Sequence, residues 1–349
     1  YLVINMYYMF GDSGVSSLDL RSWDTSKVTN MSQMFYNTKN VTNIFMGNRF
    51  VTTNVISMFQ MFDGSNVGEL DLQYFDNSNV ETIYGIFQNT TNLSNLVLGS
   101  NFVTDKVTNL SDIFNDSGVS TLDLSDWDTS NVTNMESAFK DTDSLTSLTL
   151  GGTFDSSNVG DFSNFFNGSG VSGLVFADFN TSSATDMSSM FSNMANQEAF
   201  DLSSFDTSNV TSMESMLENL GRVTTIDISD WDTSSVSNFS NILGTTTLDR
   251  ATSINLGSLA NSTVIPVGYD MSGGPAVQRV CVGDIDLIDL SGSPSYATYF
   301  SGTKMSLPST SGAVDIVCDG GKFDVRVSCN SVTGEIDNAD GSSNISTCF

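Results

Sequence analysis

The sequence predicts an α/β solenoid of the leucine-rich-repeat type, a right-handed coil of about ten repeats of about 26 residues. The first observation is a recurring phrase: WDTSNVTNM at 127–135 returns with few changes from Trp23, Phe205 and Trp231. The second is that each copy combines an alternating strand pattern with a helix-like apolar spacing. A coil of this length cannot bury its apolar face alone, so neighbouring coils have to stack.

The first part of each repeat is predicted to be a short strand, as in Leu18-Asp19-Leu20. A period of two directs both apolar residues inward and the middle residue outward. The middle residues of successive repeats then form an exposed row on the strand face. This candidate binding face begins with Asp19, Phe45, Asp71, Val97 and Asp123.

The second part of each repeat is predicted to be a helical turn. Val132, Met135 and Phe139 have the apolar spacing of one helix face. In each repeat the residue before the position equivalent to Met135 has a side chain that can cap a helix N-terminus. These residues are Asn5, Asn30, Ser57, Thr82, Asn109, Asn134, Asp161, Asp186, Ser212 and Asn238.

Two domains are predicted, a solenoid over 1–264 whose first coil is partial and a Cys-containing β-rich cap or assembly unit over 265–349. The second region carries a hairpin pattern around Asp319-Gly320-Gly321. All four cysteines, Cys281, Cys318, Cys329 and Cys348, lie in it. An even number in a short β-like segment predicts two disulfides and an oxidising compartment. Of three pairings, Cys281–Cys318 with Cys329–Cys348 is favoured.

Composition excludes several classes of function. The net charge is −28 with only 15% charged residues, so scarce Lys and Arg make nucleic acid and anionic membranes poor partners. No apolar stretch reaches the roughly 18 residues of a membrane span, so no direct membrane insertion is expected. The absence of histidine excludes His-based catalysis, and the aspartates recur at equivalent repeat positions, as architectural residues do. We expect neither an enzyme nor a cofactor.

Two kinds of site remain as candidates. Asp201 and Asp227 are expected side by side on adjacent coils, which makes them a weak calcium candidate. The chain also has thirteen N-x-S/T sequons. Three of them fall on predicted caps, which leaves as glycosylation candidates Asn40, Asn89, Asn92, Asn115, Asn131, Asn167, Asn180, Asn209, Asn261 and Asn344.

The repeat resembles a known family. The phrase L-D-L-S-x-W/F-D-T-S-N-V-T-N-M-x-x-M-F is similar to that of the BspA-like leucine-rich-repeat surface proteins, also catalogued as a domain of unknown function in Mycoplasma, Listeria, lactobacilli and protists. The resemblance runs from Val3 to about Val264 and implies a secreted or surface-anchored protein without catalysis. Family members often place Cys shortly after the closing M-F, where this chain has a hydroxyl residue. Those residues are Thr38, Ser65, Thr90, Ser117, Thr142 and Ser169.

We therefore expect a non-enzymatic structural or adhesive protein of the extracellular cell surface, and a glycoprotein if its sequons are used. The chain begins inside a coil, which leaves two explanations: it is a fragment without its cap, or a second copy completes the coil, and such a heterologous contact makes head-to-tail filaments. The partner is then the protein itself, or a host or cell-surface protein or glycan. The alternative is a receptor-like module that recognises a peptide or glycan on the exposed strand face.

Overall fold

A computed structural model describes residues 3–243 except 178, 229 and 239. Beyond these it describes the backbone of short strands within 253–337. The chain divides into two compact units, residues 1–172 and 173–349.

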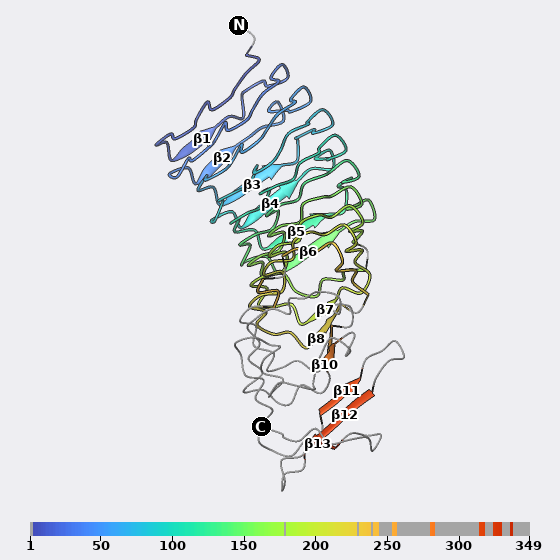
Figure 1. Ribbon diagram of the computed structural model, residues 1–349. Helices are drawn as coiled ribbons and strands as arrows, with labels where there is room; N and C mark the ends of the chain where they lie inside the picture. The colour runs from blue at the N-terminus through green and yellow to red at the C-terminus, as the bar shows by residue number, and fades with distance from the viewer. Residues whose placement is uncertain are drawn as a thin grey trace. The chain divides into compact units, whose positions relative to one another are not determined.

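The first unit is a stack of coils that contains six short strands. They are β1 (Ser17–Asp19), β2 (Asn43–Phe45), β3 (Glu69–Leu72), β4 (Asn95–Leu98), β5 (Thr121–Leu124) and β6 (Ser147–Leu150). The strands pair in parallel, β1 with β2, β3 with β4 and β5 with β6, and lie along one side of the coils (Figure 1). The predicted inward and outward alternation is confirmed, since Leu70 and Leu72 are buried while Glu69 and Asp71 are exposed.

The second unit continues the same pattern. Its strands β7 (Ala199–Asp201), β8 (Thr225–Asp227), β9 (Ser253–Leu256) and β10 (Val280–Val282) form one parallel sheet. β11 (Val314–Val317), β12 (Asp324–Cys329) and β13 (Ile336–Asp337) form an antiparallel sheet. The predicted hairpin between 317 and 324 is therefore present. Parallel pairing extends through β10, beyond residue 264 where the prediction placed the end of the solenoid.

The predicted disulfides stay a prediction. Cys318 and Cys348 lie outside the described residues, and for Cys281 in β10 and Cys329 in β12 only the backbone is described.

The predicted helical turns are wrong, and so is the α/β class: within residues 3–243 the chain has strands and turns but no helix. Where a helix was expected, two four-residue turns follow one another. Met34 N–H donates to Met31 O at 3.2 Å and Tyr36 N–H to Gln33 O at 3.1 Å. Gln33 and Asn37 have positive φ, which is incompatible with a continuing right-handed helix.

Bonds to the next coil explain why the helix does not form. Gln33 N–H donates to Phe59 O at 3.0 Å and Phe35 N–H to Met61 O at 2.8 Å. Backbone groups alternate between their own turn and the neighbouring coil, so every second N–H extends the parallel ladder. The apolar spacing i, i+3, i+4 suits this double turn as well as it suits a helix.

The predicted cap residues have a different role from the one expected. Asn30 forms parallel bridges with Asn5 and with Ser57 in the flanking coils. Its Oδ1 still accepts a hydrogen bond from Ser32 N–H at 2.8 Å. The capping chemistry is therefore present, but it closes an Asx turn within a parallel ladder.

Repeated side chains fill the interior of the first unit. The closing aromatic residues form one column of stacked rings, each 5.2–6.0 Å from the next between centroids. The column consists of Phe10, Phe35, Phe62, Phe87, Phe114, Phe139 and Phe166. Ring stacking along the coil axis means that each added coil covers the ring of the last one.

Buried hydroxyls take the position at which the resemblance expects Cys. They lie in pairs across adjacent coils, Thr38 with Ser65 at 2.9 Å, Thr90 with Ser117 at 3.0 Å and Thr142 with Ser169 at 2.8 Å between Oγ atoms. Each Thr also donates to the carbonyl of the Phe three residues earlier. A pair of hydroxyls satisfies this buried turn without thiol chemistry.

The architecture is thus a β-solenoid of about eight turns of parallel strands, fewer than the ten coils predicted. The outward row of predicted strand positions also includes Val175, but the described residues around Val175 form no strand. There the Gln197 side chain replaces a neighbouring backbone: it accepts from Leu174 N–H and donates to Leu174 O, both at 3.1 Å.

Candidate binding surfaces

The strand face places the predicted binding row on the surface. Asp19 is in register with Phe45 in the neighbouring coil, and Asp71 with Val97. Phe45 and Val97 are 47% and 43% exposed. Asp123 is exposed at the equivalent position of β5. The row therefore alternates carboxylates with accessible apolar groups.

Arg21 ties two members of this row together. Its guanidinium makes a two-pronged ion pair with Asp19 and lies 5.6 Å above the ring of Phe45. The hydrogen bond from Arg21 lowers the pKa of Asp19 to about 2. Asp19 is therefore a fixed negative charge beside a held aromatic ring.

The two aspartates of the calcium candidate lie next to each other but do not form a complete metal site. Asp201 and Asp227 are register partners of β7 and β8, as predicted. Asp201 Oδ1 already accepts hydrogen bonds from Ser203 N–H and Oγ. Within the described part of the chain no three His, Cys, Asp or Glu side chains gather where they could hold a metal ion. The calcium prediction therefore rests on two carboxylates alone.

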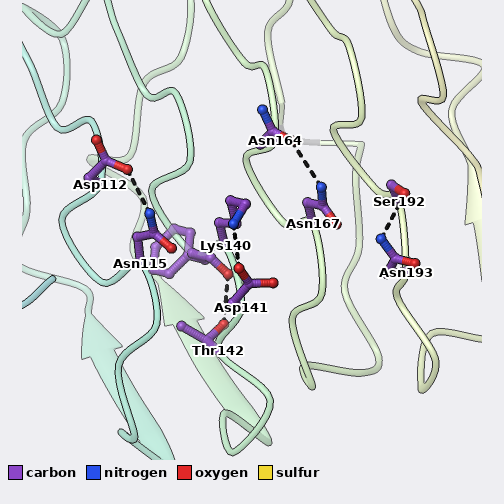
Figure 2. Close-up of polar contacts among 10 residues, drawn as sticks. Asp112, Asn115, Lys140, Asp141, Thr142, Asn164, Asn167, Ser192 and Asn193 are labelled. Atoms are coloured by element: carbon purple, nitrogen blue, oxygen red, sulfur yellow. Dashed lines mark hydrogen bonds and ion pairs between the residues drawn. The ribbon is translucent and has the colours of Figure 1, made fainter. Parts of the chain in front are cut away.

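Most glycosylation candidates in the described coils use the side-chain amide within the fold. Asn131 Nδ2 donates to Asp105 O at 2.8 Å and Asn209 Nδ2 to Ser182 O at 2.9 Å. Figure 2 shows Asn115 donating to Asp112 Oδ1 and Asn167 donating to Asn164 Oδ1. A glycan at any of these would compete with that hydrogen bond.

The other six glycosylation candidates fall into three groups. Asn89 donates to Asp63 Oδ1, and Asn92 donates to Asn66 Oδ1. Asn180 Oδ1 accepts from Ser182 N–H, and Asn40 is exposed. Asn261 and Asn344 lie outside the described residues. Glycosylation itself stays a prediction.

Sequence reasoning missed a groove of about 460 Å³ at the double turns of the first unit. It is lined by Tyr36, Asn37, Lys39, Asp63, Gly64, Ser65, Asn66, Asn89 and Thr91 from three successive coils. Its size is that of a small-molecule site. The signal was readable: Asn37, Gly64 and Asn89 occupy one repeat position, and the glycine removes the middle side chain of that column.

A surface cluster of aromatic rings lies on the same turns. Tyr8 packs against Tyr36 at 5.9 Å between ring centroids, and Phe59 stacks on Tyr84 at 5.2 Å. Tyr7, with about half of its surface exposed, links the two pairs. All five aromatic residues lie between positions 7 and 84, so the surface of these first coils differs in composition from that of the later described coils.

No helix in the part of the chain that the structure describes has the length and apolar character of a membrane span.

Comparison with known proteins gives one family. A family model described as "Mycoplasma protein of unknown function, DUF285" matches residues 2–71, 56–172 and 174–255. No curated protein and no solved structure matches the chain.

Proposed function

We propose that this chain, which belongs to the DUF285 family of unknown function, is a non-enzymatic structural and adhesive protein of the extracellular cell surface. The proposal follows from how the repeats use their residues. Inward positions repeat nearly unchanged, whereas the outward positions vary from coil to coil. Such a variable surface is suited to recognition, and the nearly unchanged interior holds that surface in place.

The strand face carries this proposal. Phe45 and Val97 expose apolar surface between Asp19, Asp71 and Asp123 on one row of the first unit. Exposed apolar groups rimmed by charge are typical of interaction sites. A partner with alternating basic and apolar groups would complement this row.

The test is binding to printed peptide and glycan arrays. The triple variant Phe45→Ala, Asp71→Ala and Val97→Ala removes the centre of the row, and we expect loss of whatever the unmodified protein binds. The matched control is Ile56→Ala, because Ile56 is also 47% exposed but lies outside the strands. An unchanged array pattern for the triple variant would refute recognition by this face.

The structural part of the proposal is self-association into head-to-tail filaments, the arrangement that a stacked ladder of coils would extend. Electron microscopy of the secreted protein tests it. Rows of end-to-end particles that lengthen with concentration are expected, and discrete short rods at every concentration would contradict it. A receptor-like module that binds a peptide or glycan without polymerising is the second candidate. It is favoured if the protein binds to the arrays but electron microscopy shows only discrete short particles.

A further inference from the structure

The groove at Gly64 has polar atoms that the rest of the described chain leaves without hydrogen-bond partners. Asp63 Oδ1 accepts a hydrogen bond from Asn89 Nδ2 at 2.8 Å, but no described residue donates to Asp63 Oδ2. Likewise no described residue forms an ion pair with the Lys39 ammonium or accepts a hydrogen bond from Asn66 Nδ2. Among described residues the fully occluded side-chain atoms without a partner belong to Asn77 alone. The groove atoms therefore remain accessible.

Asp63 gives the groove a buried acceptor. Its residue is only 5% exposed, and burial is the main cause that raises the pKa of its carboxyl. A carboxylate in such surroundings gains from any donor that reaches its second oxygen. It also repels a negatively charged ligand, so phosphate and carboxylate groups fit the site poorly.

The other groups of the lining add one positive charge and several neutral donors and acceptors. The Lys39 ammonium gives the lining one charge of each sign and opposes a cationic ligand. Asn66 offers donor hydrogens, Asn89 Oδ1 offers an acceptor, and the Thr91 hydroxyl can serve as either. The ring of Tyr36 adds an apolar wall. Mixed donors and acceptors beside one ring, with no net charge, are complementary to a ligand rich in hydroxyl groups.

We infer that the groove at Gly64 binds a neutral saccharide, whose hydroxyls contact Asp63, Lys39 and Asn66 and whose apolar ring face packs on Tyr36. The opening depends on Gly64, which lies between Asn37 and Asn89 in the column of positive-φ residues. Because Gly64 and both of these neighbours line the groove, a side chain at position 64 would narrow it.

A second groove, of about 520 Å³, shows what a less suitable site looks like. The amides of Asn54 and Asn79 donate to Ser26 O and Thr53 O of the preceding coil, and the Lys106 ammonium donates to Asn79 Oδ1. Its polar groups are largely committed to the fold. The groove at Gly64 is therefore the better candidate.

The decisive variant is Gly64→Asn. Asparagine is accepted at positive φ in the flanking coils, at Asn37 and Asn89, so the backbone tolerates it. The added Cβ would lie 3.3 Å from Asn37 Cα, a tight contact that small shifts relieve. The control is Gly168→Asn, which makes the same change at the same repeat position, outside the groove. Its Cβ would lie 2.6 Å from Asp141 Oδ1, the end of a side chain that can move aside.

The measurement is the two-dimensional ¹H–¹⁵N NMR spectrum of the full chain during titration with methyl glycosides of glucose, galactose, mannose and N-acetylglucosamine. We expect at least one of them to shift the side-chain amide signals of Asn66 and Asn89, with a dissociation constant in the millimolar range. Gly64→Asn should weaken this binding at least tenfold, and Gly168→Asn should leave it unchanged. If Gly64→Asn fails to fold, Asn66→Ala and Lys39→Gln replace it, with at least a threefold loss expected for each.

Three results would overturn the inference. They are no shift of these amides with any of the four glycosides, full binding by the groove variants, or tighter binding of glucuronate, glucosamine or a short neutral peptide such as acetyl-Gly-Ser-Gly-amide. The strand-face triple variant keeps the two proposals apart, since it should lose array binding while its response to the glycosides stays normal.

Discussion

Asn77 is a defect in a column of buried threonines, and its repair should stabilise the first unit. In the other coils each Thr hydroxyl donates to a backbone carbonyl of the next coil, and Thr25 and Thr52 also accept from a backbone N–H there. Thr25 Oγ1 donates to Val51 O and accepts from Val51 N–H, both at 2.7 Å. Thr52 makes the same pair of bonds with Asp76, and Thr104 donates to Asp128 O. Asn77 occupies this position while only 1% exposed, and neither atom of its amide has a partner.

The variant Asn77→Thr restores the column. The register of the other threonines would bring its hydroxyl to the N–H and carbonyl of Val103. An unsatisfied buried polar group costs about 1–3 kcal/mol, and a new hydrogen bond contributes about 1 kcal/mol. We expect a net gain of about 2 kcal/mol, which for a unit of this size raises Tm by about 4–8 °C.

Thermal and urea unfolding followed by circular dichroism measure this gain, and hydrogen exchange of the amides around residue 77 locates it. The reverse change, Thr129→Asn, is the control, because Thr129 is fully buried and bonds to Asp155 in the same way. It should cost about what Asn77→Thr gains. Equal or lower stability of Asn77→Thr would refute the account of the column.

Three other contacts each give a prediction. Gly151→Ala should destabilise by about 1–3 kcal/mol, because its Cβ would lie 2.1 Å from Ser125 O, whereas Gly152→Ala meets no atom within 4 Å and should be tolerated; equal melting curves for the two would contradict this. The double variant Thr142→Cys and Ser169→Cys should form a disulfide, seen as the loss of two hydrogens by mass spectrometry. The disulfide should raise the free energy of unfolding by about 2–4 kcal/mol over the reduced form. Thiols that stay free under oxidising conditions would show that these two positions are not placed for a disulfide. Arg21→Gln should raise the pKa of Asp19 from about 2 toward 3.8, as followed by carboxyl NMR titration. Because the folded pKa is depressed, the stabilisation is present above about pH 4 and disappears as the pH falls through about 2, and an unmoved pKa would exclude Arg21 as its cause.

Much of the scaffold was readable from the sequence because it repeats. The alternation in Leu70-Asp71-Leu72 predicted that these residues form a strand, which side chains point inward, and that the strand pairs with the next coil. A period of two admits few alternatives. The adjacency of Asp201 and Asp227 followed from the same register. The double turn was not readable, because Met31, Met34 and Phe35 have a spacing that a helix and two linked turns share. Only the bonds to the next coil decide between them, and those belong to the stack.

The groove escaped prediction for a different reason. It arises from a single residue, Gly64, at a position where neighbouring coils carry Asn37 and Asn89. A search for shared features passes over such an exception. Asn77 is a second exception of this kind, where one coil departs from a threonine column. In a repeat protein, departures from the consensus carry the local chemistry.

The paired hydroxyls have a consequence for how such a chain changes length. Thr38 pairs forward with Ser65, and Thr90 with Ser117, so coils of two kinds alternate. The glycines directly after a strand whose added Cβ would meet the backbone of the preceding coil, Gly47 and Gly99, likewise belong to one kind only. Deleting a single coil would bring two coils of the same kind together, which would mismatch both the Thr–Ser pairs and the glycine contacts. Genetic variants of this solenoid should therefore differ in length by two coils at a time, which is the 52-residue spacing between Phe35 and Phe87.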